Sequence, residues 1–164
     1  MPPSFTLTEQ FAFGSQYSWR LKDSEIRFRG SGDYERLVLQ RIPAAAEQIA
    51  AFLSALELLQ VWNWRNDYDP TEVGFEVMDG SEWTFSASSG NHNCQCGGSN
   101  GYPSYVDPKL TTTDRGRFAL LLAAMHDCFA IDRYIYKAKR FAELQTQKQG
   151  EQGGEPELPS TVSH

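Results

Sequence analysis

Residues 61–103 have the sequence VWNWRNDYDPTEVGFEVMDGSEWTFSASSGNHNCQCGGSNGYP, which contains three of the four tryptophans of the chain. Residues 66–108 also carry seven acidic side chains and no lysine or arginine. Large apolar rings are typical of buried positions, whereas carboxylates are typical of the solvated surface. This stretch is therefore expected to supply both a central part of the sheet and an acidic surface.

Apolar and polar residues alternate within this stretch at the period of a half-buried β-strand. The alternation covers residues 75–78 and 82–87, and Asp79 and Gly80 lie between them. Both central positions of a type I′ turn need positive φ, which this dipeptide tolerates best. The sequence therefore predicts a hairpin at this point, followed after a Gly-Asn turn by a third strand at 92–96.

The N-terminal part predicts further strands and one helix. Residues 5–13 are rich in β-forming residues, 17–22 and 25–29 alternate between apolar and charged side chains, and 36–40 can add a strand to this meander. Pro43 then suits the first turn of a helix, because its missing N–H would have no partner there. The apolar stripe of that helix consists of Ile49, Phe52, Leu53, Leu56 and Leu59 or Gln60.

The C-terminal part predicts a second amphipathic helix, capped by Thr113 or Asp114. Residues 131–144 extend that helix or form a second piece with a basic surface. Residues 145–164 are rich in Gln, Gly, Glu, Pro and Ser and are predicted to form a disordered tail. The stripe of the second helix consists of Phe118, Leu121, Leu122, Met125 and Phe129, and the basic surface of Arg133, Lys137, Lys139 and Arg140.

These elements predict an α+β fold. Strands joined by short turns pair antiparallel, and amphipathic helices bury their apolar faces against a sheet. We expect an antiparallel meander sheet covered by two helices, in the order β-β-β-α-β-β-β-α. With 164 residues, 40% of them hydrophobic, the chain is the size of one domain, assigned to residues 1–144. The alternative is a more curled sheet wrapped around the final helix.

Composition narrows the class of protein. The chain has no run of eighteen apolar residues and no signal-like N-terminus, so a cytoplasmic protein is expected, with no membrane partner. Three cysteines are an odd number and do not form a disulfide framework. The net charge of −6 disfavours nucleic acid and suits a basic protein partner.

The cysteine and histidine positions raise the question of a metal site or a cysteine nucleophile. His92, Cys94 and Cys96 would project from one face of a strand, which allows a zinc site with His126 or Cys128 as fourth ligand. Structural zinc sites usually use C-x-x-C turns, so this spacing favours free thiols, and no metal or cofactor is expected. A cysteine nucleophile would need a histidine that meets it in space. The acidic run lacks an accompanying nucleophile or metal motif, so no catalytic residues are assigned.

Three pieces of the central stretch, residues 64–68, 79–83 and 98–103, form a series W-x-x-x-Y, D-G-x-x-W and G-x-N-x-Y-P. This series resembles small uncharacterised bacterial proteins, some of which look like immunity proteins of polymorphic toxin systems. The resemblance covers about a quarter of the chain. It implies an α+β fold and binding rather than catalysis, and it identifies no toxin.

The same residues have a structural and a functional interpretation. In the structural one, Trp83 and Trp64 are core residues, Asp79 holds its turn, and the Asn100 side chain bonds to the backbone near the end of the sheet. In the functional one, aromatic anchors border an acidic patch that attracts a basic partner, which an immunity protein would block by occlusion. The alternatives are a small enzyme or small-molecule-binding module with a pocket near residues 98–103, or an accessory domain of a larger assembly. The candidate partner-binding residues are Trp62, Trp64, Tyr68, Glu72, Glu76, Asn100 and Tyr102.

Overall fold

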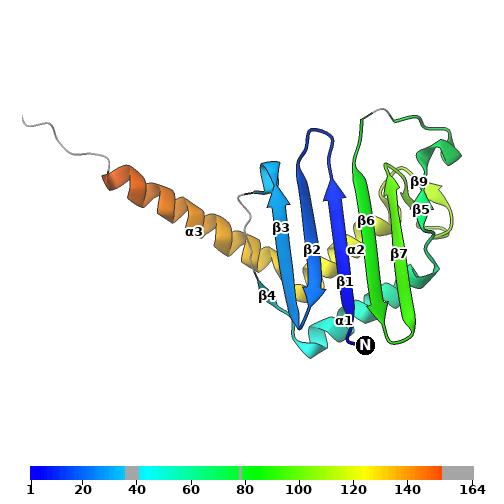
Figure 1. Cartoon of the computed structure of the whole chain (residues 1–164), viewed down its shortest axis with the longest axis horizontal. Helices are drawn as coiled ribbons and strands as arrows, with labels where there is room; N and C mark the ends of the chain where they lie inside the picture. Colours follow the sequence, from blue (N-terminus) through cyan, green and yellow to red (C-terminus); the bar gives the residue numbers. More distant parts are fainter. Residues whose placement is uncertain (36–40, 78, 153–164) are drawn as a thin grey trace, which may run out of the picture.

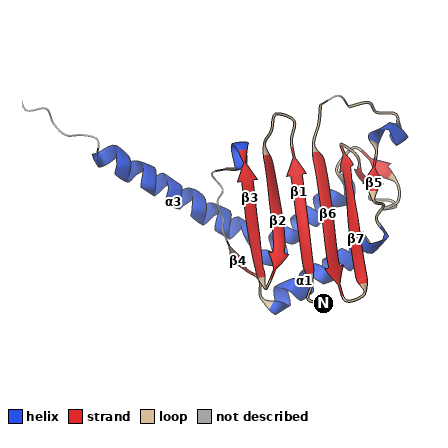
Figure 2. Ribbon diagram, in the orientation of Figure 1, coloured by secondary structure: helices blue, strands red, loops and turns tan. Residues whose placement is uncertain are grey.

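The computed structural model describes residues 1–35, 41–77 and 79–152, which build a mixed, mostly antiparallel sheet with helices against one of its faces (Figures 1 and 2). The strand order is β4-β3-β2-β1-β6-β7-β5, and β5 is the one parallel partner. The strands of this sheet are β1 (Ser4–Gln10), β2 (Gln16–Lys22), β3 (Glu25–Ser31), β4 (Ile42–Pro43), β5 (Asp67–Tyr68), β6 (Glu82–Ser89) and β7 (His92–Ser99). A separate pair is formed by β8 (Tyr102–Pro103) and β9 (Thr111–Thr112).

Alternation of apolar and polar residues produces the strands, because one face of the sheet is covered and the other is open. Phe5 and Leu7 of β1 are buried on the covered face, and their neighbours Trp19 and Leu21 of β2 are buried beside them. The hairpin of β2 and β3 and the strand β7 are confirmed. The predicted strand at 36–40 lies outside the described residues.

The predicted hairpin around Asp79 and Gly80 is wrong. Residues 75–77 form no strand, residue 78 lies outside the described residues, and Gly80 does not have a positive φ. The reason is that β6 already pairs with β1 over residues 82–88 on one edge and with β7 over residues 82–89 on the other. No edge of β6 remains free for residues 75–77. The other predicted turn, at Gly90 and Asn91 between β6 and β7, is confirmed, and Gly90 has φ +57° there.

Helices α1 (Ala46–Leu58) and α2 (Gly116–Phe129) cover the same face of the sheet (Figure 1). The rings of Phe52 on α1 and Phe129 on α2 lie 5.3 Å apart, and that of Phe52 lies 4.9 Å from Phe5 of β1. Both helical stripes are therefore confirmed as core. The predicted cap at Thr113 or Asp114 is wrong, because the N-cap position of α2 is Arg115, which makes no side-chain cap hydrogen bond. Asp114 Oδ1 lies one residue earlier and accepts a hydrogen bond from the Gly116 backbone N–H at 3.0 Å.

A third helix, α3 (Ile131–Gln152), extends beyond the β3 edge of the sheet (Figure 1). Within the described residues the expected two helices become three, because residues 131–144 belong to a separate helix, which was one of the two predicted options. The 3-10 turns η1 (Gly32–Tyr34), η2 (Val61–Asn63) and η3 (Pro70–Val73) lie between the other elements. Residues 145–152, predicted as part of a disordered tail, are helical, and 153–164 lie outside the described residues. Among the helices of the described part of the chain, none combines the length and the apolar character needed to cross a bilayer.

Candidate functional site

Trp83 of β6 is the centre of an aromatic cluster in the core. Its side chain is 1% exposed, and its ring lies 4.5 Å from that of Phe118, 5.9 Å from that of Tyr102 and 6.1 Å from that of Tyr68. The indole Nε1–H donates to the Gly101 carbonyl at 2.8 Å. The aromatic residues of the three-piece sequence series therefore meet around one buried ring.

Three of the four aromatic residues predicted to contact a partner belong to this core. Trp64, Tyr68 and Tyr102 are 7%, 0% and 4% exposed, so they present no surface to a partner, and the contact role predicted for them is wrong. The fourth, Trp62, is half-buried, and its Nε1–H donates to Glu57 Oε1 at 2.6 Å. The structural interpretation of the aromatic residues is the one that their burial supports.

Close backbone packing explains the glycines of the series. A Cβ atom at Gly98 or Gly101 would collide with the Tyr68 carbonyl oxygen, so these two positions admit no side chain without rearrangement. Between them Asn100 adopts φ +55°, and its Oδ1 accepts from the Ser81 N–H at 3.1 Å. Asn100 thus holds the start of β6 against the end of β7, as the structural interpretation predicted.

Glu72 and Glu76 are both exposed, but their surroundings differ. Glu72 forms a two-point ion pair with Arg65, with oxygen–nitrogen distances of 2.6 and 2.7 Å, and it accepts from the Thr111 hydroxyl at 3.0 Å. These hydrogen bonds, that from Arg65 first, lower the pKa of Glu72 to about 2. Glu72 therefore fastens η3 to the β9 segment, while Glu76 remains available at the surface.

The Glu72 ion pair should make stability depend on pH. Its pKa is lower in the folded chain than in the unfolded one, so its contribution is full above about 4.5 and is lost as the pH falls through about 2. We expect Glu72→Gln to lower the urea midpoint at pH 6, and the difference from wild type to close between pH 4.5 and 2. Glu76→Gln is the control and should show no such convergence; the same pH profile for both variants would contradict this assignment.

A depression of about 390 Å³ is lined by residues of the β1–β2 loop, of the segment that leads into β6, and of the end of β7. Asp79, Glu82 and Asn100 are among the residues that line it, and none of its lining residues is a lysine or arginine. Phe13 at the loop tip is fully exposed, and Val77 is 44% exposed. We call this the acidic end surface, defined by Phe13, Val77, Asp79 and Glu82.

Sequence reasoning found the acidic part of this surface but missed Phe13. Residues 5–13 were predicted as one strand, whereas β1 ends at Gln10 and Phe13 lies in the loop with φ +72°. Gly14 and Ser15 after it are a turn signal that could have ended the strand earlier. An aromatic residue at a turn that no core can reach is then a candidate surface residue.

The cysteine and histidine positions do not converge on a metal site. Cys96 is buried and its thiol faces the Phe85 carbonyl oxygen at 3.4 Å, whereas His92 is exposed, with Nδ1 3.6 Å from Glu57 Oε1. His126 Nδ1 lies 2.9 Å from Asp132 Oδ1. Within residues 1–35, 41–77 and 79–152, no group of three or more potential ligands is arranged for a metal ion.

One buried charged group was not foreseen. Glu9 of β1 faces the covered side, is 1% exposed, and accepts hydrogen bonds from Tyr17 and from Arg115, the latter at 2.7 and 3.2 Å. The Arg115 guanidinium also lies 5.1 Å from the centre of the Phe118 ring. Arg115 precedes α2, so this group links the start of the helix to the central strand.

No model of a protein family matches the chain, and no curated protein matches it significantly in sequence. The protein is therefore classified by its own architecture. It is an α+β domain with one helical layer, one open sheet face and an acidic, partly apolar surface at one end of the sheet.

Proposed function

We propose that this protein is a non-catalytic binding domain whose acidic end surface takes a basic segment of a protein partner. The observation that carries the proposal is the depression lined by Asp79 and Glu82 beside the fully exposed ring of Phe13. An exposed aromatic side chain that no core contact explains is typical of an interaction anchor. Carboxylates around it would favour lysine and arginine side chains and speed their approach.

The narrower proposal is an immunity protein that neutralises a cognate bacterial toxin by occlusion. The sequence resemblance supports it, and so does the charge of the surface, because toxins that act on nucleic acid present basic active-site surfaces. Covering such a surface requires no chemistry from the binding domain. The mechanism is then steric exclusion of the toxin's substrate.

The partner to test first is the product of a toxin-like gene adjacent to the gene of this protein. We expect Asp79→Lys/Glu82→Lys to weaken the complex at least 100-fold and to abolish protection of co-expressing cells. Each substitution replaces a carboxylate by a positive charge. At an interface with a basic partner, this change removes an attraction and adds a repulsion. Affinity would be measured by calorimetry, and circular dichroism would show that the fold is retained.

The matched control is Glu47→Lys/Glu143→Lys, which makes the same change of charge at exposed positions on α1 and α3. It should change affinity less than threefold. Phe13→Ala tests the apolar contribution and should weaken binding about tenfold. Wild-type affinity for Asp79→Lys/Glu82→Lys would refute this surface as the binding site.

The alternative is a small-molecule pocket near residues 98–103, and one observation favours keeping it. The same depression includes Asn100, and its volume falls within the range of small-ligand sites. Saturable binding of a cationic small molecule that Asn100→Ala abolishes, with no effect on any protein partner, would favour this function over the first.

A further inference from the structure

The open face of the sheet carries a second charged region, of opposite sign. The helices cover one face (Figures 1 and 2), and the outward positions of β1, β2 and β3 hold hydroxyl, amide and basic side chains. Glu25 is the single acidic residue among these outward positions. The chain is acidic as a whole, so a basic sheet face is a local feature and not a consequence of composition.

Two cationic side chains of this face form a cross-strand pair. Arg20 of β2 lies directly opposite Arg27 of β3, and like charges in opposite positions destabilise a strand pair. The one carboxylate of Glu25 faces two arginines, because it lies 3.7 Å from Arg27 and 3.8 Å from Arg41. Arg29 forms no ion pair with any acidic residue in the described part of the chain. The face therefore has positive charge that an anion would compensate.

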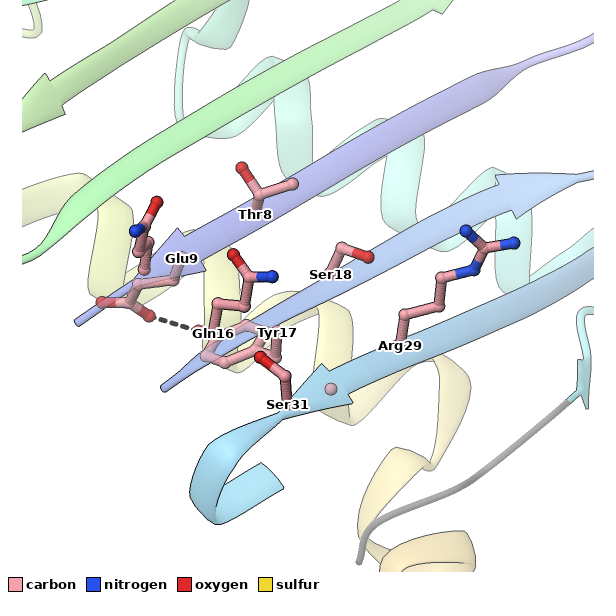
Figure 3. A pocket seen from close by; sticks show the side chains of 9 residues that line it. Thr8, Glu9, Gln16, Tyr17, Ser18, Arg29 and Ser31 are labelled. Atoms are coloured by element: carbon pink, nitrogen blue, oxygen red, sulfur yellow. Dashed lines mark hydrogen bonds between the residues drawn. The ribbon is translucent and has the colours of Figure 1, made fainter. Parts of the chain in front are cut away.

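Next to these arginines lies a depression of about 340 Å³ (Figure 3). The register brings its polar side chains together in cross-strand pairs, with Thr8 opposite Ser18, Gln10 opposite Gln16, Ser18 opposite Arg29 and Gln16 opposite Ser31. Figure 3 shows the labelled side chains on three neighbouring strands and the hydrogen bond between Tyr17 and Glu9. The open-face side chains around the hollow are therefore hydrogen-bonding groups with one guanidinium among them. Glu9 and Tyr17 also line it, but the Glu9 carboxylate is buried on the covered face, where it accepts hydrogen bonds from Tyr17 and Arg115.

We propose that this hollow binds the phosphomonoester group of a small metabolite, anchored by Arg29. A guanidinium donates two parallel hydrogen bonds to phosphate oxygens, and hydroxyl and amide groups can satisfy the remaining oxygens. The volume is that of a small-ligand site. The outward positions of β1–β3 offer no aromatic ring on which a base could stack, which argues against single-stranded nucleic acid.

The test uses glycerol 3-phosphate added to the 15N-labelled full chain, with glycerol and sodium chloride at equal ionic strength as references. We expect saturable shifts of backbone amides in β1–β3 with glycerol 3-phosphate alone. Arg29→Gln should weaken binding at least tenfold, and Ser18→Ala about threefold. Lys22→Gln removes the same charge from the same face at the other end of β2, and it should change the affinity less than twofold.

Three outcomes would overturn the proposal. The first is the absence of saturable shifts, or shifts that sodium chloride reproduces. The second is equal weakening by Arg29→Gln and Lys22→Gln, which would indicate a diffuse charge effect without a site. The third is Arg29-dependent binding to vesicles that contain phosphatidic acid while glycerol 3-phosphate does not bind, which would assign the face to a membrane surface.

Discussion

Trp83→Ala is expected to lower the free energy of unfolding by about 3–5 kcal/mol, the usual cost of truncating a buried tryptophan. The side chain is 1% exposed, and removal would leave a cavity among the rings of Tyr68, Tyr102 and Phe118. It would also leave the Gly101 carbonyl without its donor. The measurement is urea unfolding at pH 7, followed by circular dichroism.

Trp62→Ala is the matched control, since it removes the same residue type from a half-buried position. Its expected cost is about 1 kcal/mol, mainly the loss of the hydrogen bond to Glu57. Trp83→Phe should lie between the two, because it keeps ring packing and loses the N–H donor. Equal effects of Trp83→Ala and Trp62→Ala would show that the cluster around Trp83 is not the centre of the core.

Arg115→Leu is the second large effect, with an expected cost of about 3 kcal/mol at pH 7. This substitution leaves the carboxylate of Glu9 buried without its cationic partner, and an uncompensated buried charge is strongly destabilising. The value lies at the lower end of the usual range because the Arg115 side chain is 35% exposed, so water reaches the pair.

A double variant separates the charge effect from lost packing. Glu9→Gln keeps an acceptor for the Tyr17 hydroxyl and removes the charge, so Glu9→Gln/Arg115→Leu should regain at least half of the stability that Arg115→Leu loses. Arg133→Leu, an exposed arginine on α3, is the control and should cost less than about 0.5 kcal/mol. A double variant less stable than Arg115→Leu would mean that the pair does not act through charge.

The candidate site shows how far local sequence information reaches. The absence of lysine and arginine from residues 66–108 predicted an acidic surface, and the carboxylates of Glu76, Asp79 and Glu82 are exposed. The same information placed Tyr68 at that surface, although its hydroxyl bonds to the Pro108 carbonyl inside the protein. The residues next to an aromatic ring in the sequence do not show whether a distant segment of the chain will pack over it and bury it.

Local periodicity determined the strands β2, β3, β6 and β7 and the core stripes of α1 and α2, because burial of one face imposes a period of two on a strand and of 3.6 on a helix. Only the tertiary structure decided that β1 pairs with β6, which leaves residues 75–77 without a partner strand. It also decided that Arg115 meets Glu9 across 106 residues of sequence. Hydrogen bonding along strand edges and pairing of distant charges depend on which segments meet, and that choice leaves no repeating pattern in the chain.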